Sequence, residues 1–573
     1  MARKVRTALI AVAASILLLN SICNHLFRHP PSITAQDLLA PPLPLSLQTN
    51  PNLAISEHEQ LEQDQEEEEV SYKNSRHVTS VRESIPTVSI LLPAWEILVI
   101  LSPETPRPQS DGDVACLFPN NDSSTAVPAG FLSSPYRQTF KCDFPMTLRR
   151  RFPFPQPILT SFSPEEKTPA EIKSPAPELL RWNFLVYDSI TTDTDVVLFV
   201  KGLNHRQGSS RSPTDFACVF GDDVINGVKT AVTSAVQEVI RCQIPKLTAV
   251  LPPSKIKISL EVLEQNRVVP SVAHYTPPPR KIATNQPKSQ ICACTMVYNV
   301  AKFLKEWVIY HSAIGVERFI LYDNASDDDL DRVVEELIQS GYNVTTAFWI
   351  WPKTQEAGFS HCAIRAKDSC EWVTYIDVDE FIYSQSWLSS LNPSRNMLQS
   401  LLPKSESSSS LIGQVLIGCY EFGPSNQISN PRNGVIQGYN CRRREENRHK
   451  SIVRLDAIDD SLLNVIHHFR LKQGYKGKKL RIEDAAVNHY KYQAWVEFKT
   501  KFRRRVSAYV ADWTQAVNPA SKDRTPGLGY APVEPHGWAG RFCEVYDNRL
   551  RDLIRRWFGF GLSYGYQDGL AES

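Results

Sequence analysis

The chain has 573 residues, and its 63 lysines and arginines nearly balance its 62 aspartates and glutamates. A content of 42% hydrophobic and 10% aromatic residues is typical of a globular protein and excludes a wholly disordered or fibrous chain. One stretch alone is apolar enough to cross a bilayer, which excludes a transporter with several membrane spans. The charge is unevenly distributed: residues 1–84 are acidic overall, whereas residues 442–505 carry 18 basic and 8 acidic side chains.

The N-terminal segment has the layout of a membrane anchor. Three basic residues lie within positions 1–6, and the apolar segment 7–22 continues without a charge to Phe27. A full span needs ~20 residues, and no small-x-small cleavage pattern follows. We therefore interpret residues 7–27 as a retained signal-anchor transmembrane helix, with a cleaved secretory signal as the alternative. The positive-inside rule predicts a cytosolic tip and a lumenal remainder, and the short span favours a single-pass type II protein of the Golgi membrane.

Residues 28–84 are typical of a disordered stem. Six prolines fall between positions 30 and 51, and eight carboxylates without a lysine or arginine lie between positions 57 and 69. Such a segment cannot bury enough apolar surface to fold, and it would hold the folded part away from the membrane. In a lumenal chain, the sequons at Asn121 and Asn343 become candidate glycosylation sites.

Residues 85–285 are predicted to form an all-β domain with a sandwich-like architecture. Short runs of β-branched and aromatic residues, such as 182–188 and 195–203, alternate there with Pro, Gly, Asn and Asp clusters. Nothing in this region resembles a catalytic constellation. Four of its cysteines form two pairs at similar spacing, which favours a disulfide within each pair: Cys116 with Cys142, and Cys218 with Cys242.

From residue 286 onward the pattern changes to alternating strands and helices. Apolar runs at 291–299, 317–324, 343–351 and 372–383 predict four buried strands, and the segments 301–315, 327–341 and 359–371 between them have helical periodicity. Alternation at this spacing predicts a mostly parallel α/β sheet.

Polar side chains follow three of these predicted strands. Asn299 ends the first, Asp323 and Asn324 end the second, and Asp377 and Asp379 lie within the fourth. Ligands of parallel sheets bind at the carboxyl ends of the strands, so we expect these side chains to lie close together. In an extended segment Asp377 and Asp379 share a face, and two such carboxylates suit a divalent cation that also holds diphosphate oxygens. The alternative is an acidic turn that follows a strand.

Several strings in this half of the chain resemble glycosyltransferase family 92, a group of enzymes with the GT-A fold. They occur in order as TMVYN (295–299), FLKEWVIYHSAIGVERFILYDNASDD (303–328), HCAIRAKDSCEWVTYIDVDEFIY (361–383), HKSIVR (449–454), HHF (467–469) and NHYKYQAWVEFKTKF (488–502). The anchor, stem and β-region are similar in layout to plant members that include β-1,4-galactan synthases. The resemblance implies a carbohydrate-binding-like domain at 85–285, a GT-A catalytic domain with a Rossmann-like mixed sheet at 286–545, and a C-terminal helix and tail at 546–573.

The resemblance also implies a nucleotide-sugar donor and a Mn²⁺ or Mg²⁺ ion. Asp379 would be the main metal ligand, Asp377 would reach the ribose or the metal, and His489 would be a further ligand, with a buried structural histidine as its alternative. Asp323 would accept a bond from the nucleoside, or instead cap the next helix. The expected donor-binding residues are Asn299, Asp323, Asn324, His361, Lys450 and His468, the last two on the diphosphate.

An inverting mechanism, which the resemblance implies, needs a carboxylate as general base. Glu421 is our first candidate, and Asp456, Asp459 and Glu445 remain open. The predicted activity is transfer of a hexose, galactose from UDP-galactose, to a glycan or cell-wall polysaccharide.

Two other functions are alternatives to this activity. One is a carbohydrate-binding scaffold with an inactive glycosyltransferase-like domain. The other is nucleic-acid binding through residues 442–505, which conflicts with a lumenal location. A homodimer is left open.

Overall fold

The structure is a computed structural model that describes residues 86–559, except 104–113, 162–175, 205–208, 247–255, 278–286, 404–410, 501–532 and the single positions 134, 151, 223 and 466. The chain divides into two compact units, 1–79 and 80–573, and every described residue belongs to the second unit. The predicted cytosolic tip, anchor and stem, and the tail after Gly559, lie outside the described residues. Within the described ranges, no helix is both long and apolar enough to cross a bilayer.

The described residues between 86 and 181 form the first β-module, which contains two sheets. A five-stranded sheet has the order β5-β6-β2-β1-β8, and a three-stranded sheet has the order β4-β3-β7. The predicted disulfide between Cys116 and Cys142 is present and joins the two sheets. The strands are β1 (Thr87–Leu91), β2 (Glu96–Leu101), β3 (Val114–Leu117), β4 (Ser123–Thr125), β5 (Val127–Ser133), β6 (Tyr136–Asp143), β7 (Ile158–Ser161) and β8 (Leu180–Arg181).

The described residues between 184 and 275 form the second β-module, a seven-stranded sheet of order β15-β14-β11-β12-β13-β10-β9. The second predicted disulfide, Cys218–Cys242, joins β11 to β13. Each module has a hydrophobic cluster of its own, so the predicted all-β region contains two separate cores. The strands are β9 (Leu185–Thr191), β10 (Asp195–Lys201), β11 (Phe216–Phe220), β12 (Val228–Val236), β13 (Val239–Gln243), β14 (Ile258–Val262) and β15 (Arg267–Val269).

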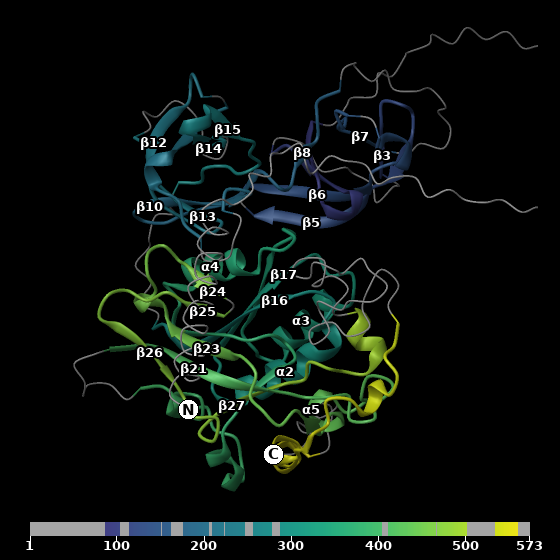
Figure 1. The fold of residues 1–573 in the computed structure, drawn as a ribbon, viewed down its shortest axis with the longest axis vertical. Helices are drawn as coiled ribbons and strands as arrows, with labels where there is room; N and C mark the ends of the chain where they lie inside the picture. The colour runs from purple at the N-terminus through teal and green to yellow at the C-terminus, as the bar shows by residue number, and fades with distance from the viewer. Residues whose placement is uncertain are drawn as a thin grey trace, which may run out of the picture. The chain divides into compact units, whose positions relative to one another are not determined.

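The predicted α/β alternation is confirmed in the half of the chain that follows residue 286 (Figure 1). Strand β16 pairs in parallel with both β17 and β19, and β17 pairs in parallel with β18. The first two connecting helices begin and end within three residues of the predicted positions, whereas α4 begins four residues earlier and ends five residues earlier than the predicted segment 359–371. The elements are β16 (Ser289–Val297), α2 (Ala301–Ile314), β17 (Arg318–Asp323), α3 (Leu330–Gln339), β18 (Val344–Phe348), α4 (Gln355–Ala366) and β19 (Cys370–Tyr375).

The rest of the chain extends this sheet to nine strands in the order β18-β17-β16-β19-β23-β21-β27-β20, with β26 beside β21. Its strands pair in both directions, so the sheet is mixed: β23 is antiparallel to β19, and β27 is parallel to β21. The remaining elements are β20 (Glu380–Tyr383), β21 (Leu411–Glu421), α5 (Val435–Gly438), β22 (Cys441–Arg442), β23 (His449–Arg454), β24 (Asn464–Val465), β25 (His468–Phe469), β26 (Tyr475–Lys479), β27 (Ala486–His489), β28 (Val545–Tyr546) and α7 (Arg549–Phe558), which is the predicted C-terminal helix.

The prediction of one strand over 372–383 is wrong. The structure has β19 and β20 there, separated by a turn at 376–379 that carries Asp377 and Asp379. The backbone N–H of Glu380 donates to the carbonyl of Asp377 at 3.0 Å, an i to i+3 bond typical of a turn. The carboxylate of Glu380 accepts a bond from the N–H of Asp377 at 2.8 Å. The two aspartates therefore lie in an acidic turn after a strand, and the extended geometry expected for them does not form.

Helix α2 covers the outer edge of β20. The indole N–H of Trp307 donates to the carbonyl of Glu380 at 3.1 Å, and the hydroxyl of Tyr310 donates to the carbonyl of Ile382 at 2.5 Å. The N–H of Ile382 donates to Nε2 of His311 at 3.5 Å. These contacts satisfy backbone groups of an edge strand, and so they fix the strand that begins directly after the acidic turn.

Three further disulfides lie in the half of the chain that follows residue 286. Cys292 and Cys294 lie two residues apart on β16 and therefore share a face of the sheet. They pair with two cysteines of the α4–β19 segment, and the third bond joins β22 to the residues before β28. Among the described cysteines Cys419 alone is a free thiol. The three bonds are Cys292–Cys370, Cys294–Cys362 and Cys441–Cys543.

Candidate active site

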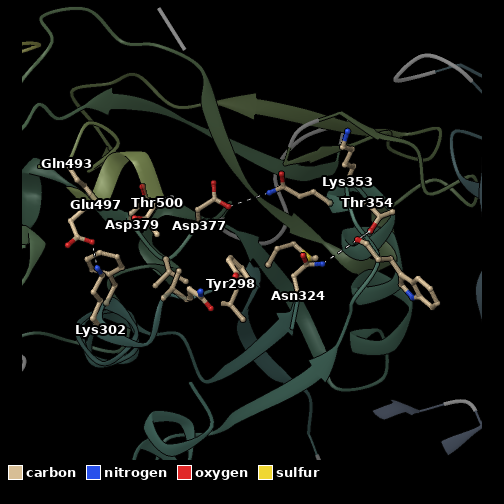
Figure 2. A pocket seen from close by; sticks show the side chains of 18 residues that line it. Tyr298, Lys302, Asn324, Lys353, Thr354, Asp377, Asp379, Gln493, Glu497 and Thr500 are labelled. Atoms are coloured by element: carbon tan, nitrogen blue, oxygen red, sulfur yellow. Dashed lines mark hydrogen bonds and ion pairs between the residues drawn. The ribbon is translucent and has the colours of Figure 1, made fainter. Parts of the chain in front are cut away.

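A cavity of about 190 Å³ lies at the carboxyl ends of β16, β17 and β19. In the view of Figure 2, Lys302 and Lys353 lie toward opposite ends of the cavity, with Asp377 and Asp379 between them. The predicted meeting of the strand ends is therefore observed for Asn299, Asn324 and both aspartates. The lining residues are 296–300, 302, 303, 324, 351, 353–355, 377–379, 493, 497 and 500.

The carboxylate of Asp377 is buried and paired with a buried lysine. Nζ of Lys450, on β23, lies 3.0 Å from Oδ2 of Asp377 and 2.7 Å from Oε1 of Glu380. The same Nζ lies 2.6 Å from Nε2 of His467. Burial by itself would lower the pKa of Lys450, but the carboxylates of Asp377 and Glu380 raise it. One buried ammonium group is therefore shared between two buried carboxyl groups.

Asp377 also touches the segment that begins α4. The side-chain amide of Gln355 donates to Oδ1 of Asp377 at 3.4 Å. Nε2 of His467 lies 3.8 Å from Oδ2 of the same carboxylate. Asp377 is thus held by groups from β23, from the residue before β25 and from the start of α4. Three elements far apart in the sequence fix the position of this one side chain.

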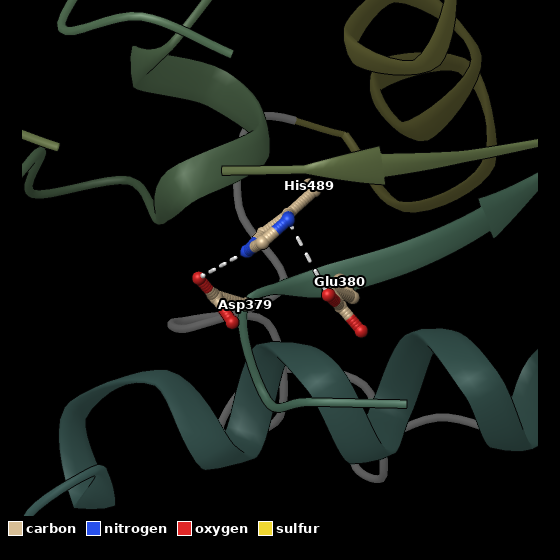
Figure 3. A group of neighbouring side chains, drawn as sticks. All are labelled: Asp379, Glu380 and His489. Carbon is tan, nitrogen blue, oxygen red and sulfur yellow. Dashed lines mark ion pairs between the residues drawn. The ribbon is translucent and has the colours of Figure 1, made fainter. Parts of the chain in front are cut away.

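Asp379, Glu380 and His489 form a compact cluster beside Asp377 (Figure 3). One ligand atom from each lies within 4.8 Å of the others. The antiparallel register of β20 and β27 places His489 opposite Glu380. Nε2 of the imidazole lies 3.3 Å from Oδ2 of Asp379, and Nδ1 lies 3.4 Å from Oε1 of Glu380.

The chemistry of this cluster suits a metal-binding imidazole. Burial lowers the pKa of His489 to about 4, so the ring is neutral at ordinary pH. A metal-binding histidine commonly directs its second nitrogen at a carboxylate, which fixes the tautomer and leaves the first nitrogen free for the metal. Glu380 is in the place of that carboxylate, and Asp379 lies beside the other nitrogen. Two of the three predicted ligands are in the cluster, and Glu380 takes the place expected for Asp377.

Two predicted donor-binding residues line the cavity and a third lies behind it. The amide of Asn324 donates to the carbonyl of Trp349 at 2.7 Å, and Oδ1 of Asn299 accepts from the N–H of Asp327 at 2.9 Å. Asp323 is outside the lining residues. Its Oδ1 accepts from the backbone N–H and the hydroxyl of Ser326, at 3.0 and 2.7 Å, so the carboxylate closes a turn after β17. Burial raises the pKa of Asp323.

The structure places three other predicted donor-binding residues away from the cavity surface. Lys450 is buried behind Asp377, as described above. Nδ1 of His361, on α4, lies 2.7 Å from the hydroxyl of Tyr322, and burial lowers the pKa of His361 to about 3. His468 packs its ring 5.1 Å from that of His449, while the preceding His467 reaches Lys450.

Glu421, the predicted general base, lies at the end of β21 and outside the residues that line the cavity. Lys491 donates to its Oε1 at 2.5 Å, and the hydroxyl of Tyr492 donates to Oε2 at 3.2 Å. Burial would raise the pKa of Glu421, but Lys491 lowers it. Among the described lining residues, the acids are Asp377, Asp379 and Glu497, and Glu497 forms an ion pair with Lys302.

Sequence reasoning missed several residues of this site, including Glu497. Glu380 directly follows the two aspartates. Its acidic side chain at the start of an apolar run was the signal that could have identified it. His467 directly precedes His468, which was predicted to bind the donor. Lys302 and Gln355 lie at the starts of α2 and α4, and Lys353 lies in the loop before α4, so that only the fold brings them to the cavity.

Both predicted glycosylation sites are accessible. Asn121 is exposed in the turn between β3 and β4, and Asn343 is exposed directly before β18. Their use stays a prediction.

Comparison with known sequences gives a consistent family. A profile of glycosyltransferase family 92 matches residues 288–524. A family 92 protein of Oryza sativa subsp. japonica is 43% identical over 399 residues, which is 66% of this chain and 67% of that protein. One from Arabidopsis thaliana is 42% identical over 394 residues, 67% of this chain and 68% of that protein.

A Ricinus communis member of the same family aligns over 486 residues at 38% identity, covering 83% of this chain and 85% of that protein. Among solved structures, a mannosyltransferase from Pyrobaculum calidifontis in complex with GDP-Man and Mn²⁺ is 11% identical and covers 40% of this chain and 65% of its own, with a TM-score of 0.24. A likeness at that score carries no argument about this chain. The sequence matches establish the family: the chain belongs to glycosyltransferase family 92.

Proposed function

We propose that this chain is a metal-dependent, inverting hexosyltransferase that transfers galactose from UDP-galactose to a hydroxyl group of a glycan or cell-wall polysaccharide. The observation that carries the proposal is the Asp379–Glu380–His489 cluster beside a cavity at the carboxyl ends of parallel strands, in a chain of glycosyltransferase family 92. The choice of galactose rests on the resemblance to plant β-1,4-galactan synthases. The same resemblance assigns the GT-A fold to the mixed nine-stranded sheet and its helices.

The cluster residues fit a divalent cation. We assign Asp379 and Nε2 of His489 as ligands, with Glu380 holding the imidazole from its other nitrogen. A mixed oxygen and nitrogen donor set favours Mn²⁺, whereas Mg²⁺ prefers oxygen ligands and water. When bound there, the cation supplies Lewis-acid stabilisation of the departing diphosphate. Asp377, already paired with Lys450, is assigned to the ribose side of the donor.

The remaining lining residues suit a nucleoside diphosphate. Lys302 and Lys353 offer ammonium groups to phosphate oxygens, and such charge-assisted bonds are stronger than neutral ones. Asn299 and Asn324 offer amide groups near the ends of β16 and β17. The ammonium group of the buried Lys450 reduces the net negative charge of the group that it forms with Asp377 and Glu380, which favours binding of an anionic donor.

Inversion needs an acceptor hydroxyl that attacks the anomeric carbon from the side opposite the diphosphate, and a carboxylate that takes its proton. Glu421 remains our candidate from the sequence, and Glu497 is a second candidate because it lines the cavity. A Gln variant of each separates them. The catalytic base keeps donor binding but loses transfer when its carboxylate becomes an amide, while the other variant keeps transfer.

We propose a Golgi membrane location with the catalytic domain in the lumen. The basic tip and apolar segment 7–27 support a type II anchor. The five disulfides among the described residues fit an oxidising compartment. Digestion of the full chain from plant membranes with a glycosidase tests this, because use of Asn121 or Asn343 in the lumen makes the band shift. An unshifted band, with the lysine side chains open to a membrane-impermeant label in sealed vesicles, contradicts the topology.

The activity is tested by incubating the solubilised full chain with a panel of UDP-sugars and glycan acceptors in Mn²⁺. We expect elongation of a galactan acceptor with UDP-galactose and release of UDP. Retained glycan binding with no release of UDP from any sugar nucleotide would instead identify a binding scaffold.

A further inference from the structure

One wall of the cavity is the segment 349–355, which joins β18 to α4. Trp351, Lys353, Thr354 and Gln355 of this segment all line the cavity. No residue of either β-module is among the described lining residues. The second β-module and the residue that leads into it nevertheless make the contacts that hold this wall.

The indole of Trp351 is held by three side chains from the β-region. Its ring stacks on that of Trp182, with 5.8 Å between centroids and 2° between planes, and it packs at 5.3 Å against Tyr187. The indole N–H donates to Oδ2 of Asp188 at 3.2 Å. Trp351 is 1% exposed, so its position is set by these neighbours and by its own segment.

The backbone of the wall is held as well. Nζ of Lys201, at the end of β10, donates to the carbonyl of Lys353 at 3.0 Å. Within the segment, the indole N–H of Trp349 donates to the hydroxyl of Thr354 at 2.9 Å, and that hydroxyl donates to the carbonyl of Trp351 at 2.7 Å. A lysine from the second β-module is thus hydrogen-bonded to the backbone of the segment at the position where it lines the cavity.

A second contact reaches the other side of the site. Gln237, in the tight turn between β12 and β13, donates from Nε2 to the carbonyl of Asn464 at 2.7 Å. The N–H of Asn464 donates back to Oε1 of Gln237 at 3.3 Å. Asn464 is on β24, which pairs with β25, and His467 lies between these two strands. Gln237 is 8% exposed, so this reciprocal pair is buried.

Both contacts lead to the partners of Asp377. Gln355, at the end of the wall, and Lys450, which His467 touches, are two of the groups that hold its carboxylate. We infer that Trp182, Lys201 and Gln237 are positioning residues of the transferase site, and that the second β-module supports the wall of the donor cavity without lining it. The positional half of this inference is that these residues hold the segment 349–355 in place. The kinetic half is that this placement sets the affinity for the donor, and it alone rests on the proposed function.

The positional half is tested by amide hydrogen exchange of the full chain without any ligand. Trp182→Leu removes the stacked ring, and Trp95→Leu makes the same change in the first β-module, where Trp95 packs on Phe144 and Phe154. We expect exchange at 349–355 to rise roughly tenfold or more in Trp182→Leu and to stay native in Trp95→Leu. Native exchange at 349–355 in a folded Trp182→Leu chain overturns the inference. If that variant fails to fold, Lys201→Met gives the same two outcomes.

The kinetic half is tested on the same variants with UDP-galactose and UDP as probes. We expect the donor KM and the Kd for UDP with Mn²⁺ to rise roughly fivefold or more in Trp182→Leu, with the acceptor KM unchanged. Trp182→Phe, which keeps an aromatic face, recovers most of the affinity. Equal donor KM in native and Trp182→Leu chains overturns this half. Absence of turnover in the native chain instead contradicts the proposed function, and the exchange result then decides the positional claim alone.

Discussion

At the scale of single residues, the charge of the site depends on how Lys450 is placed. Asp377, Glu380 and Lys450 are all nearly inaccessible to water, and the lysine lies within 3.0 Å of both carboxylates. A buried ion pair is weak in net stability, but removing one partner leaves a charge that nothing compensates. Lys450 is therefore needed for the fold of the acidic turn, even though it does not reach the cavity.

Lys450→Met is expected to lower the free energy of unfolding by about 3–5 kcal/mol, because two carboxylates lose their cation. Denaturation of the full chain by urea measures the loss. Lys472→Met is the control, since its exposed pair with Asp460 is worth about 0–1 kcal/mol. The double variant Lys450→Met with Asp377→Asn is expected to be more stable than the single one. Equal stability of Lys450→Met and the native chain contradicts the assignment.

Sequence reasoning identified much of the site but not its finer placement. Strand-end polar residues were predictable because parallel strands bring their carboxyl ends together, and Asp379 and Asn324 line the cavity as expected. The choice of His468 over His467 was not resolvable, because neighbouring residues of a hairpin point to opposite faces and its register depends on tertiary contacts. Lys353 was missed because it lies in the loop between β18 and α4, whose contacts with the β-region come from residues far away in the sequence.

At the scale of elements, the turn between β19 and β20 could not be predicted from the sequence. Alternating apolar and acidic residues over 375–381 are compatible with one long strand. The break arises because β20 pairs with β27 and accepts bonds from α2, while β19 pairs with β16 and β23. These partners are far away in the sequence, whereas the parallel strands and their helices follow from local periodicity and were predicted correctly.

Helix α2 makes the stability of this region depend on pH through His311. Burial lowers the pKa of His311 to about 3, below its unfolded value of about 6.5. Between these values the unfolded chain binds more protons than the folded chain, so this contribution to stability is complete above pH 6.5 and falls as the pH drops. The slope is about 1.4 kcal/mol per pH unit.

We expect the native chain to lose about 2 kcal/mol more than His311→Gln between pH 7 and pH 5, measured by urea denaturation at each pH. The exposed His536 provides the control variant, His536→Gln, which should follow the native curve. Parallel curves for the native chain and His311→Gln would show that His311 is protonated equally in both states.

At the scale of the whole molecule, the β-modules and the catalytic sheet share a hydrophobic core. One cluster of buried residues includes Leu98 of the first β-module, Phe199 of the second, and Trp349 of the catalytic half. The sequence predicted an all-β region and an α/β domain from their different periodicities, and both are observed. The shared core could not be predicted from the sequence, because an apolar pattern in each of two regions does not indicate whether the two regions pack against each other.

Phe199→Ala and Phe220→Ala should distinguish the core that the β-modules share with the catalytic sheet from the core within the second β-module. Phe199 lies 5.7 Å from the ring of Trp349, whereas Phe220 packs within the second β-module against Tyr275. Each truncation is expected to cost about 3–5 kcal/mol. Only Phe199→Ala should also raise hydrogen exchange in β18 and α4. Equal exchange there in the two variants would mean that the catalytic half is stable without this contact.

The account as a whole depends on the Asp379 cluster. The most direct measurement is the rate of UDP release from UDP-galactose by the solubilised full chain, with and without EDTA and Mn²⁺, in the native chain, in Asp379→Asn and in the exposed control Asp460→Asn. We predict that EDTA stops release, that Mn²⁺ restores it, and that Asp379→Asn loses roughly 100-fold or more while Asp460→Asn keeps the native rate. Native turnover by Asp379→Asn, or turnover that EDTA leaves unchanged, would contradict a metal-dependent transferase at this site.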